Sequence, residues 1–327
     1  MPGKKNFDAQ LAAIEALRYE SDEACIAPLR AALRQQSNYI VSKAADQVAQ
    51  RRLELLLPDL LTAFDRFFSE PEKRDPQCWA KNSISRALAA LELQDPAPFL
   101  RGIKHVQFEP VYGGRSDTAG TLRGTCALAL VQCRSIPETE LLRHLIDVLV
   151  DSDKSARNDA VRALEQLGSP SAALLLRLRA QITSSDPEEP EILGACYSAV
   201  LSIDGPSSLP WAARFLSTED AAAGEAALAI AASHSPEAFE MLRSRWENAR
   251  DPWFRSVMLS AIALTRQTAA TEFLLGLVRA DSIGADVAIE ALLRSAPSEE
   301  TVQQLKALVT GNTRLERAFA ANTTARR

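Results

Sequence analysis

The sequence predicts an all-α fold, a right-handed α-α superhelix in which about nine helical hairpins stack as a solenoid. Three observations support this prediction. Apolar residues recur at spacings of three and four over most of the chain, which is one face of an α-helix. Pro170, Pro206 and Pro236 open equivalent helices at steps of 36 and 30 residues, a period typical of helical repeat proteins. Glycine is scarce, at 13 residues, and no run alternates β-branched with polar residues as a strand would.

Residues 151–168 show one repeat most clearly. Asp151 and Asp153 precede a helix, a position where acidic side chains are favoured. Gly168 ends this helix, and a Ser-Pro step begins the next one. The apolar stripe of the first helix consists of Ala156, Ala160, Ala163, Leu164 and Leu167. One unit is therefore a helix, a tight turn, a second helix and a loop, and an isolated pair has too little core to be stable.

The same frame fits the rest of the chain in order. The predicted pairs before this unit are 6–36, 37–69 and 77–105, followed by a first helix after residue 118 and a second helix at 137–150. The later pairs are 153–183, 187–217, 219–248, 251–280 and 282–310. Because repeats share one continuous core, residues 1–311 are interpreted as a single solenoid with an irregular insertion at 105–118. Residues 312–327 are expected to form a C-terminal cap and a frayed tail.

An acidic residue stands six positions before a basic residue in several units. The pairs are Asp75 and Lys81, Asp117 and Arg123, and Asp151 and Arg157. With the alanine-rich helices that follow, this pattern resembles HEAT repeats of the bacterial, phycobilin-lyase type, over most of residues 37–310. The resemblance implies that each acid bridges to the basic residue of an adjacent unit. The units at 187–203 and 219–233 depart from the pattern, with Leu-Gly and Ala-Gly where the arginine is expected.

Composition excludes several classes of function. The net charge is −5 and the pI is about 5.5, so nothing attracts the whole protein to nucleic acid or to an anionic membrane. No apolar run is long enough to cross a membrane, and no signal peptide follows the first residues. The five cysteines are scattered and suit buried positions in a reducing compartment. We therefore expect a cytoplasmic protein with a protein partner rather than a nucleic acid.

Catalytic and cofactor motifs are missing from the sequence. The three histidines lie in three different units, and the metalloprotease, nucleophile-elbow, phosphate-loop and dinucleotide-binding patterns do not occur. Cys126 and Cys133 share a helical face but have no further ligand beside them. The sequence predicts no catalytic residue, no cofactor and no metal site.

The segment 105–118 is the clearest interruption of the repeat. It holds apolar residues, a Gly-Gly step and Arg115, and it is longer than the other turns. Long loops in compact proteins are often functional, so we expect it to fold over the solenoid and to present Phe108, Tyr112 and Arg115 to a partner. The alternative is a divergent loop between repeats that is anchored by its aromatic side chains.

The first helices of the pairs are expected to line a concave groove. Outward positions equivalent to Asn158, Arg162 and Glu165 become Gly124, Leu128 and Val131 in the preceding unit, and Gly224, Leu228 and Ala231 two units later. A groove that is small-sided and apolar suits a helix or peptide of a partner. Leu128, Arg162 and Leu228 are the candidate contacts there. Trp79 and Trp253 are further candidates, unless they pack between units.

Arginines recur once per unit in the second helices, for example at Arg30, Arg101 and Arg177. They could bind an acidic partner, or they could cover apolar seams and pair with neighbouring acids. Taken together, the sequence favours a non-catalytic scaffold that binds a protein on its concave face. The alternatives are a HEAT-type enzyme, such as a bilin lyase or an alkylpurine DNA glycosylase, and a regulatory subunit of a nucleotide enzyme.

Overall fold

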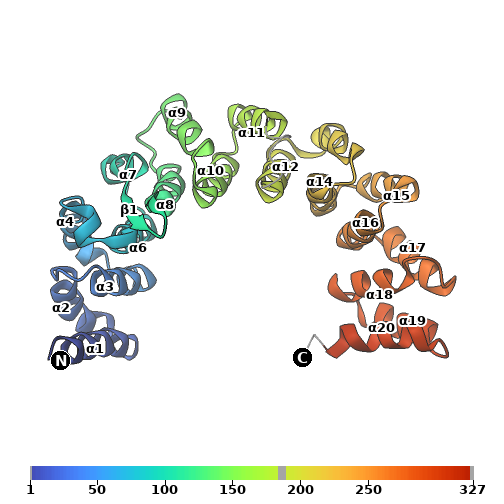
Figure 1. The fold of residues 1–327 in the computed structure, drawn as a ribbon, viewed down its shortest axis with the longest axis horizontal. Helices are drawn as coiled ribbons and strands as arrows, with labels where there is room; N and C mark the ends of the chain where they lie inside the picture. Colours follow the sequence, from blue (N-terminus) through green and yellow to red (C-terminus); the bar gives the residue numbers. More distant parts are fainter. Residues whose placement is uncertain (1, 183–188, 325–327) are drawn as a thin grey trace. The chain divides into compact units, whose positions relative to one another are not determined.

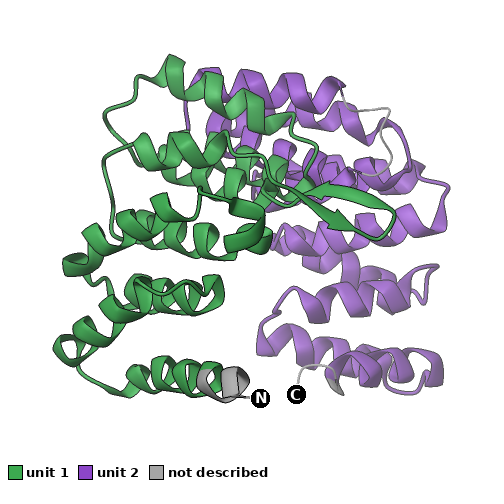
Figure 2. Cartoon of the chain, turned by 60° about the vertical axis from the view of Figure 1, so that its left-hand side comes forward, with its two compact units in different colours: residues 1–167 green, residues 168–327 purple. Residues whose placement is uncertain are grey.

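The computed structural model describes residues 2–182 and 189–324, and over these residues the protein is an all-α solenoid with one small β-hairpin. The predicted fold class is therefore confirmed. The chain divides into two compact units, residues 1–167 and residues 168–327 (Figure 2). Each unit by itself is a stack of helical pairs. That one core runs continuously through residues 1–311 stays a prediction.

Unit 1 contains ten α-helices and the hairpin within its described residues (Figure 1). Its helices are α1 (Pro2–Ala16), α2 (Asp22–Leu33), α3 (Asn38–Arg51), α4 (Leu57–Arg66), α5 (Pro71–Arg74), α6 (Trp79–Ala90), α7 (Ala97–Ile103), α8 (Gly120–Leu130), α9 (Glu138–Leu149) and α10 (Lys154–Leu167). The strands are β1 (Phe108–Val111) and β2 (Gly114–Asp117).

Unit 2 continues the same alternation of first and second helices. Its helices are α11 (Pro170–Ile182), α12 (Pro190–Asp204), α13 (Leu209–Ala213), α14 (Ala221–Ala232), α15 (Ala238–Asn248), α16 (Pro252–Leu264), α17 (Thr268–Arg279), α18 (Ala285–Arg294), α19 (Glu299–Val309) and α20 (Thr313–Thr324). Pro170 begins α11 as predicted, whereas Pro206 lies in a short 3₁₀ turn that leads into α13. Leu315 of α20 is buried, and α20 packs on α18 and α19, which closes the end of this unit.

The two units use one packing rule. First helices form a row, in which α3 packs on α6, α6 on α8 and α8 on α10, and in unit 2 α12 packs on α14, α14 on α16 and α16 on α18. Each second helix also packs on the first helix of the following pair, as α4 does on α6 and α9 on α10. The first helices are therefore buried on several sides, and this is why small residues dominate their contact faces.

Local sequence signals explain where the helices begin. The side chain of Ser21 accepts a hydrogen bond from the backbone N–H of Ala24 at the start of α2, and Asp251 does the same for Phe254 at the start of α16. Within α3 the stripe at helical spacing is fully buried. It consists of Ile40, Val41, Ala44, Ala45 and Val48.

The insertion at 105–118 is not irregular as predicted, because it contains the antiparallel hairpin β1–β2. Phe108 pairs with Asp117 and Val111 pairs with Gly114, while Gly113 in the turn has a φ of 87°. A left-handed residue of this kind suits glycine, which has no Cβ to clash. The Gly-Gly step therefore closes a hairpin rather than a loose bend.

Candidate functional site

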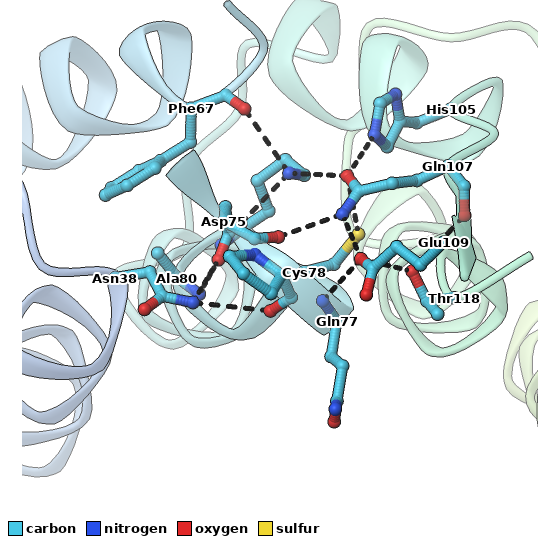
Figure 3. A network of polar contacts seen from close by, with 12 residues as sticks. Asn38, Phe67, Asp75, Gln77, Cys78, Ala80, His105, Gln107, Glu109 and Thr118 are labelled. Carbon is cyan, nitrogen blue, oxygen red and sulfur yellow. Dashed lines mark hydrogen bonds and ion pairs between the residues drawn. The ribbon is translucent and has the colours of Figure 1, made fainter. Parts of the chain in front are cut away.

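A fully buried ion pair lies beneath the hairpin in unit 1 (Figure 3). The Nζ of Lys81, on the first turn of α6, lies 3.0 Å from Oδ2 of Asp75, and neither side chain is exposed to solvent. The same ammonium donates to the backbone carbonyl of Phe67 at 3.3 Å and to Oε1 of Gln107 at 3.1 Å. All three donors of the ammonium therefore have an acceptor, which is the condition under which a buried lysine is tolerated.

Asp75 also caps the helix that carries Lys81. Its carboxylate accepts hydrogen bonds from the backbone N–H groups of Ala80 at 2.8 Å and Lys81 at 3.0 Å. The Nδ2 of Asn38, from α3 in the preceding pair, donates to the same carboxylate at 3.1 Å. The single carboxylate of Asp75 thus accepts hydrogen bonds from free N–H groups at the start of α6, neutralises a buried cation and joins two repeats.

Gln107 joins this buried pair to the hairpin (Figure 3). Its amide nitrogen donates to the backbone carbonyl of Asp75 at 2.9 Å and to Oε1 of Glu109 on β1. Its amide oxygen accepts from Lys81 and lies 3.0 Å from Nε2 of His105. Burial, the largest influence, lowers the pKa of His105, which favours the neutral ring. The hairpin therefore begins from a side chain that is itself held in the core.

Glu109 ties β1 to the start of α6. Its Oε1 accepts from the backbone N–H of Gln77 at 2.6 Å, from Gln107 and from the hydroxyl of Thr118 at 2.8 Å. Burial opposes the ionisation of this carboxyl, but the three hydrogen bonds together outweigh burial and hold the pKa of Glu109 below its usual value. Glu109 is therefore an ionised carboxylate at neutral pH.

A second charge cluster, around the buried Arg123, holds β2 at the same base of the hairpin, where Asp117 pairs with Phe108. The guanidinium of Arg123, on α8, lies 2.7 Å from Asp117 of β2 and 2.6 Å from Asp151, and it donates to the carbonyl of His105 at 2.9 Å. Burial alone would lower the pKa of Arg123, but hydrogen bonds to Asp151 and Asp117 raise it. Burial opposes the ionisation of both carboxyls, but hydrogen bonds outweigh it and lower their pKa, first from the backbone N–H groups of Gln107 and Ala119 at Asp117 and first from Arg123 at Asp151. Both strands are therefore held at the base of the hairpin, β1 through Gln107 and Glu109 and β2 through Asp117.

The implied ladder of acids and basic residues is confirmed at one position and wrong at another. Arg123 bridges to Asp151 of the following unit as the HEAT resemblance implies. Lys81 instead pairs with Asp75 of its own unit. The reason is that the short 3₁₀ turn Pro76–Cys78 between Asp75 and α6 brings the Asp75 carboxylate onto the N–H groups of the first turn of α6, from which the lysine side chain extends.

The structure brings three of the predicted contact residues together on the hairpin. Phe108 is 51% exposed and Tyr112 is fully exposed at the tip, while Arg115 donates to the carbonyl of Phe108 and to Glu72 at 2.9 Å. The aromatic side chains therefore do not anchor the segment, and the polar side chains of Gln107 and Glu109 do.

The other predicted contacts lie on separate helices. Leu128 on α8 and Leu228 on α14 are half-buried, and Arg162 on α10 is exposed and lies 3.3 Å from Asp159. The prediction that Gly124 and Gly224 line an open groove is wrong, because both residues are buried. A Cβ at Gly124 would lie 2.9 Å from the Cβ of Asp159, so this glycine instead permits close contact between α8 and α10.

Surface arginines of the second helices pair with acids. Arg30 lies 2.9 Å from Asp59, Arg101 lies 2.8 Å from Asp65, and Arg177 lies 2.8 Å from Asp204. Arg177 also lies over the ring of Trp211, and Arg101 over that of Phe68. These contacts support the structural alternative for the arginine stripe.

Sequence reasoning missed the parts played by Gln107 and Glu109. A short signal was present, because residues 106–109 alternate apolar with polar side chains shortly before a Gly-Gly step, as an exposed strand does. No spacing along the chain shows that Gln107 reaches Lys81, which is 26 residues away.

Burial limits the reactivity of the cysteine side chains. All five cysteines are buried, and burial raises the pKa of the Cys78 thiol to about 12, so it stays protonated. Over the described part of the chain, no group of three or more His, Cys, Asp and Glu side chains could hold a metal ion. No described helix is long and apolar enough to cross a membrane.

Comparisons with known proteins add no family. No family model matches the sequence, and no curated protein is similar to it. Among solved structures, the chain is similar to an engineered protein from a structural genomics consortium, at 15% identity and a TM-score of 0.33, over 96% of this chain and 90% of that one. A likeness this remote supports no conclusion on function.

Proposed function

We propose that this protein is a non-catalytic, HEAT-like scaffold that binds a protein partner, and that the hairpin of unit 1 is the first point of contact. The observation that carries the proposal is the exposed apolar surface of the hairpin. Val106 is 53% exposed, Phe108 51%, Val111 49% and Tyr112 fully exposed. Val106 and Phe108 border one hollow and Val111 another, and several exposed apolar side chains on one short segment are typical of interaction sites.

The contacts that hold the base of the hairpin support the same proposal. A two-stranded hairpin alone is marginally stable in water, yet the base of this one is held by the hydrogen bonds of Gln107 and by the ion pair of Asp117 with Arg123. A rigid hairpin loses little conformational entropy when a partner binds, so more of the contact energy appears as affinity. Exposed aromatic side chains on a rigid base therefore fit recognition better than they fit a covering loop.

The buried charges favour binding over catalysis. Asp75 and Lys81 are fully buried and satisfy each other, so neither reaches a substrate. The carboxylates of Asp117 and Asp151 are held ionised by hydrogen bonds from backbone N–H groups and from Arg123, and they lack the raised pKa of a general acid. The polar groups of this region are arranged to hold structure.

Site-specific photocrosslinking tests the proposal. A photoreactive phenylalanine analogue replaces Tyr112 in one protein and Tyr19, which is 83% exposed in the same unit, in a second. We expect one recurrent protein to be captured from cells of the source organism at position 112 and not at position 19. Equal capture at both positions would contradict contact at the hairpin.

Two further variants locate the partner. Tyr112→Ser should release the captured protein in affinity purification, whereas Tyr19→Ser should retain it. Leu128→Glu on α8 tests whether the partner also lies along the first helices. If Leu128→Glu retains every partner, the concave-face part of the proposal is wrong and the hairpin alone is the contact.

A further inference from the structure

A cavity of about 440 Å³ lies between the start of α6, the strand β1 and the start of α8. Its walls include Trp79, Asn82, Glu109, Val111, Thr118 and Thr121. All of these residues belong to unit 1, and Glu109 and Thr118 are held by the network of Figure 3. The cavity therefore has fixed walls beside the proposed contact surface.

Asn82 is the unexplained group in this cavity. Its side chain is on the first turn of α6 and is 8% exposed, and its Oδ1 is buried without a hydrogen-bond partner in the described protein. A buried amide oxygen without a donor is unfavourable, and the great majority of such groups in proteins are satisfied. Asn82 also lines the cavity, so a ligand there that carries an N–H donor would satisfy this oxygen once the amide group turns toward it.

Two other side chains that line the cavity, Glu109 and Trp79, indicate the charge of that ligand. The hydrogen bonds that Glu109 accepts all end on Oε1, which leaves Oε2 of this ionised carboxylate with no hydrogen bond among the described residues. The ring of Trp79 is 44% exposed and is held in place by Tyr39, with ring centroids 5.4 Å apart. A carboxylate, an amide oxygen and an indole face all favour a cation with several N–H donors.

We propose that this cavity receives an arginine side chain of the protein partner. A guanidinium is planar and has five donors, so it can stack on Trp79 while it donates to both Asn82 and Glu109. An ammonium can make as many contacts, as Lys81 does, but it has no flat face to stack on the indole. That the arginine belongs to a protein partner rests on the proposed function, whereas the choice of a guanidinium rests on the cavity alone.

The cavity can be tested without any partner by fluorine NMR. The full chain is labelled with 5-fluorotryptophan, and Trp79→Phe identifies the resonance of Trp79. The probe is the peptide acetyl-Gly-Arg-Gly-amide, and its control is the same peptide with citrulline, which has nearly the same shape but no charge. We expect a saturable shift of the Trp79 resonance with the arginine peptide only. Equal shifts with both peptides, or none with either, would overturn the proposal.

Variants of the two polar walls test the assigned contacts. Asn82→Leu and Glu109→Gln should each weaken binding of the arginine peptide by about tenfold or more, since each removes one charge-assisted or buried hydrogen bond. Glu92→Gln changes the same charge at a side chain that is 72% exposed in this unit and should bind as the parent protein does. An unchanged helical circular dichroism spectrum shows that each variant is folded, because the other tryptophans all lie in unit 2. Undiminished affinity in Asn82→Leu and Glu109→Gln would place the arginine elsewhere and refute the site.

The two proposals can fail separately. If the arginine peptide binds at Trp79 but no protein is captured at Tyr112, the cavity is real and the scaffold function is wrong. If a partner is captured and no peptide shifts Trp79, the scaffold function holds and the arginine site is wrong. Free arginine forms a third arm. If it binds as tightly as the peptide, the site takes a small molecule, which contradicts a partner side chain.

Discussion

Asp75→Asn is the substitution that most directly tests how the hairpin is supported. It keeps the shape of the side chain and removes its charge, so the Lys81 ammonium stays at a position with no solvent exposure and loses its anion. Breaking a buried ion pair by removing one partner costs about 3–5 kcal/mol, because the remaining charge is buried without compensation. No reduction for solvent screening applies, since both side chains are fully buried.

The consequence should be visible in a urea denaturation series. Domains of this kind have an unfolding free energy of about 5–15 kcal/mol, so the loss is a large share of the total. We expect a clearly lower urea midpoint by circular dichroism, together with faster amide exchange in α6 and the hairpin. The double variant Asp75→Asn with Lys81→Met carries no unpaired charge and should recover most of the loss. An unchanged midpoint in Asp75→Asn, or a double variant as unstable as the sum of both single changes, would refute this account of the pair.

Three further outcomes follow from the same contacts. Asn82→Leu should raise the free energy of unfolding by about 1 kcal/mol in thermal denaturation, because methyl groups of similar size replace an unpartnered buried oxygen and its amide nitrogen; a loss of stability would contradict this reading. Gly124→Ala should lower it by about 1–3 kcal/mol in the same assay, because the new methyl group would lie 2.9 Å from the Cβ of Asp159 on the next helix, and a neutral effect would show that the helices can separate freely. Acid should loosen the hairpin, because the pKa values of Asp117 and Asp151 in the folded protein are lowered. Their stabilisation is complete above the ordinary aspartate pKa of about 4, and it is lost as the pH falls through the lower folded values. Hydrogen exchange of the hairpin amides, measured between neutral pH and about pH 3, should report this loss. Equal exchange across that range would show that these carboxylates do not hold it.

Asn82→Leu should change stability and peptide binding in opposite directions. If Asn82→Leu stabilises the fold and weakens peptide binding, then the unpaired oxygen persists at a cost to stability and serves recognition. Functional sites often hold groups that are unfavourable in the free protein. The pair of measurements thus separates a recognition residue from one that only packs.

The exposed tip of the hairpin fits this division of roles. Tyr112 is fully exposed, whereas Gln107 at the base is buried. Between them, Glu109 links the strand both to the core and to the cavity. A partner that covers the tip would therefore pass close to the start of α6.

The sequence by itself determined the repeating helices of this protein. Helical periodicity and caps such as Ser21 and Asp251 act within a few residues, so they can be recognised from spacing alone. Tertiary structure alone decided the site, because Asn38, Asp75 and Gln107 meet only when three segments pack together. Whether a glycine such as Gly124 faces a groove or a neighbouring helix also depends on that packing, since a small residue is compatible with either surroundings until the next repeat is in place.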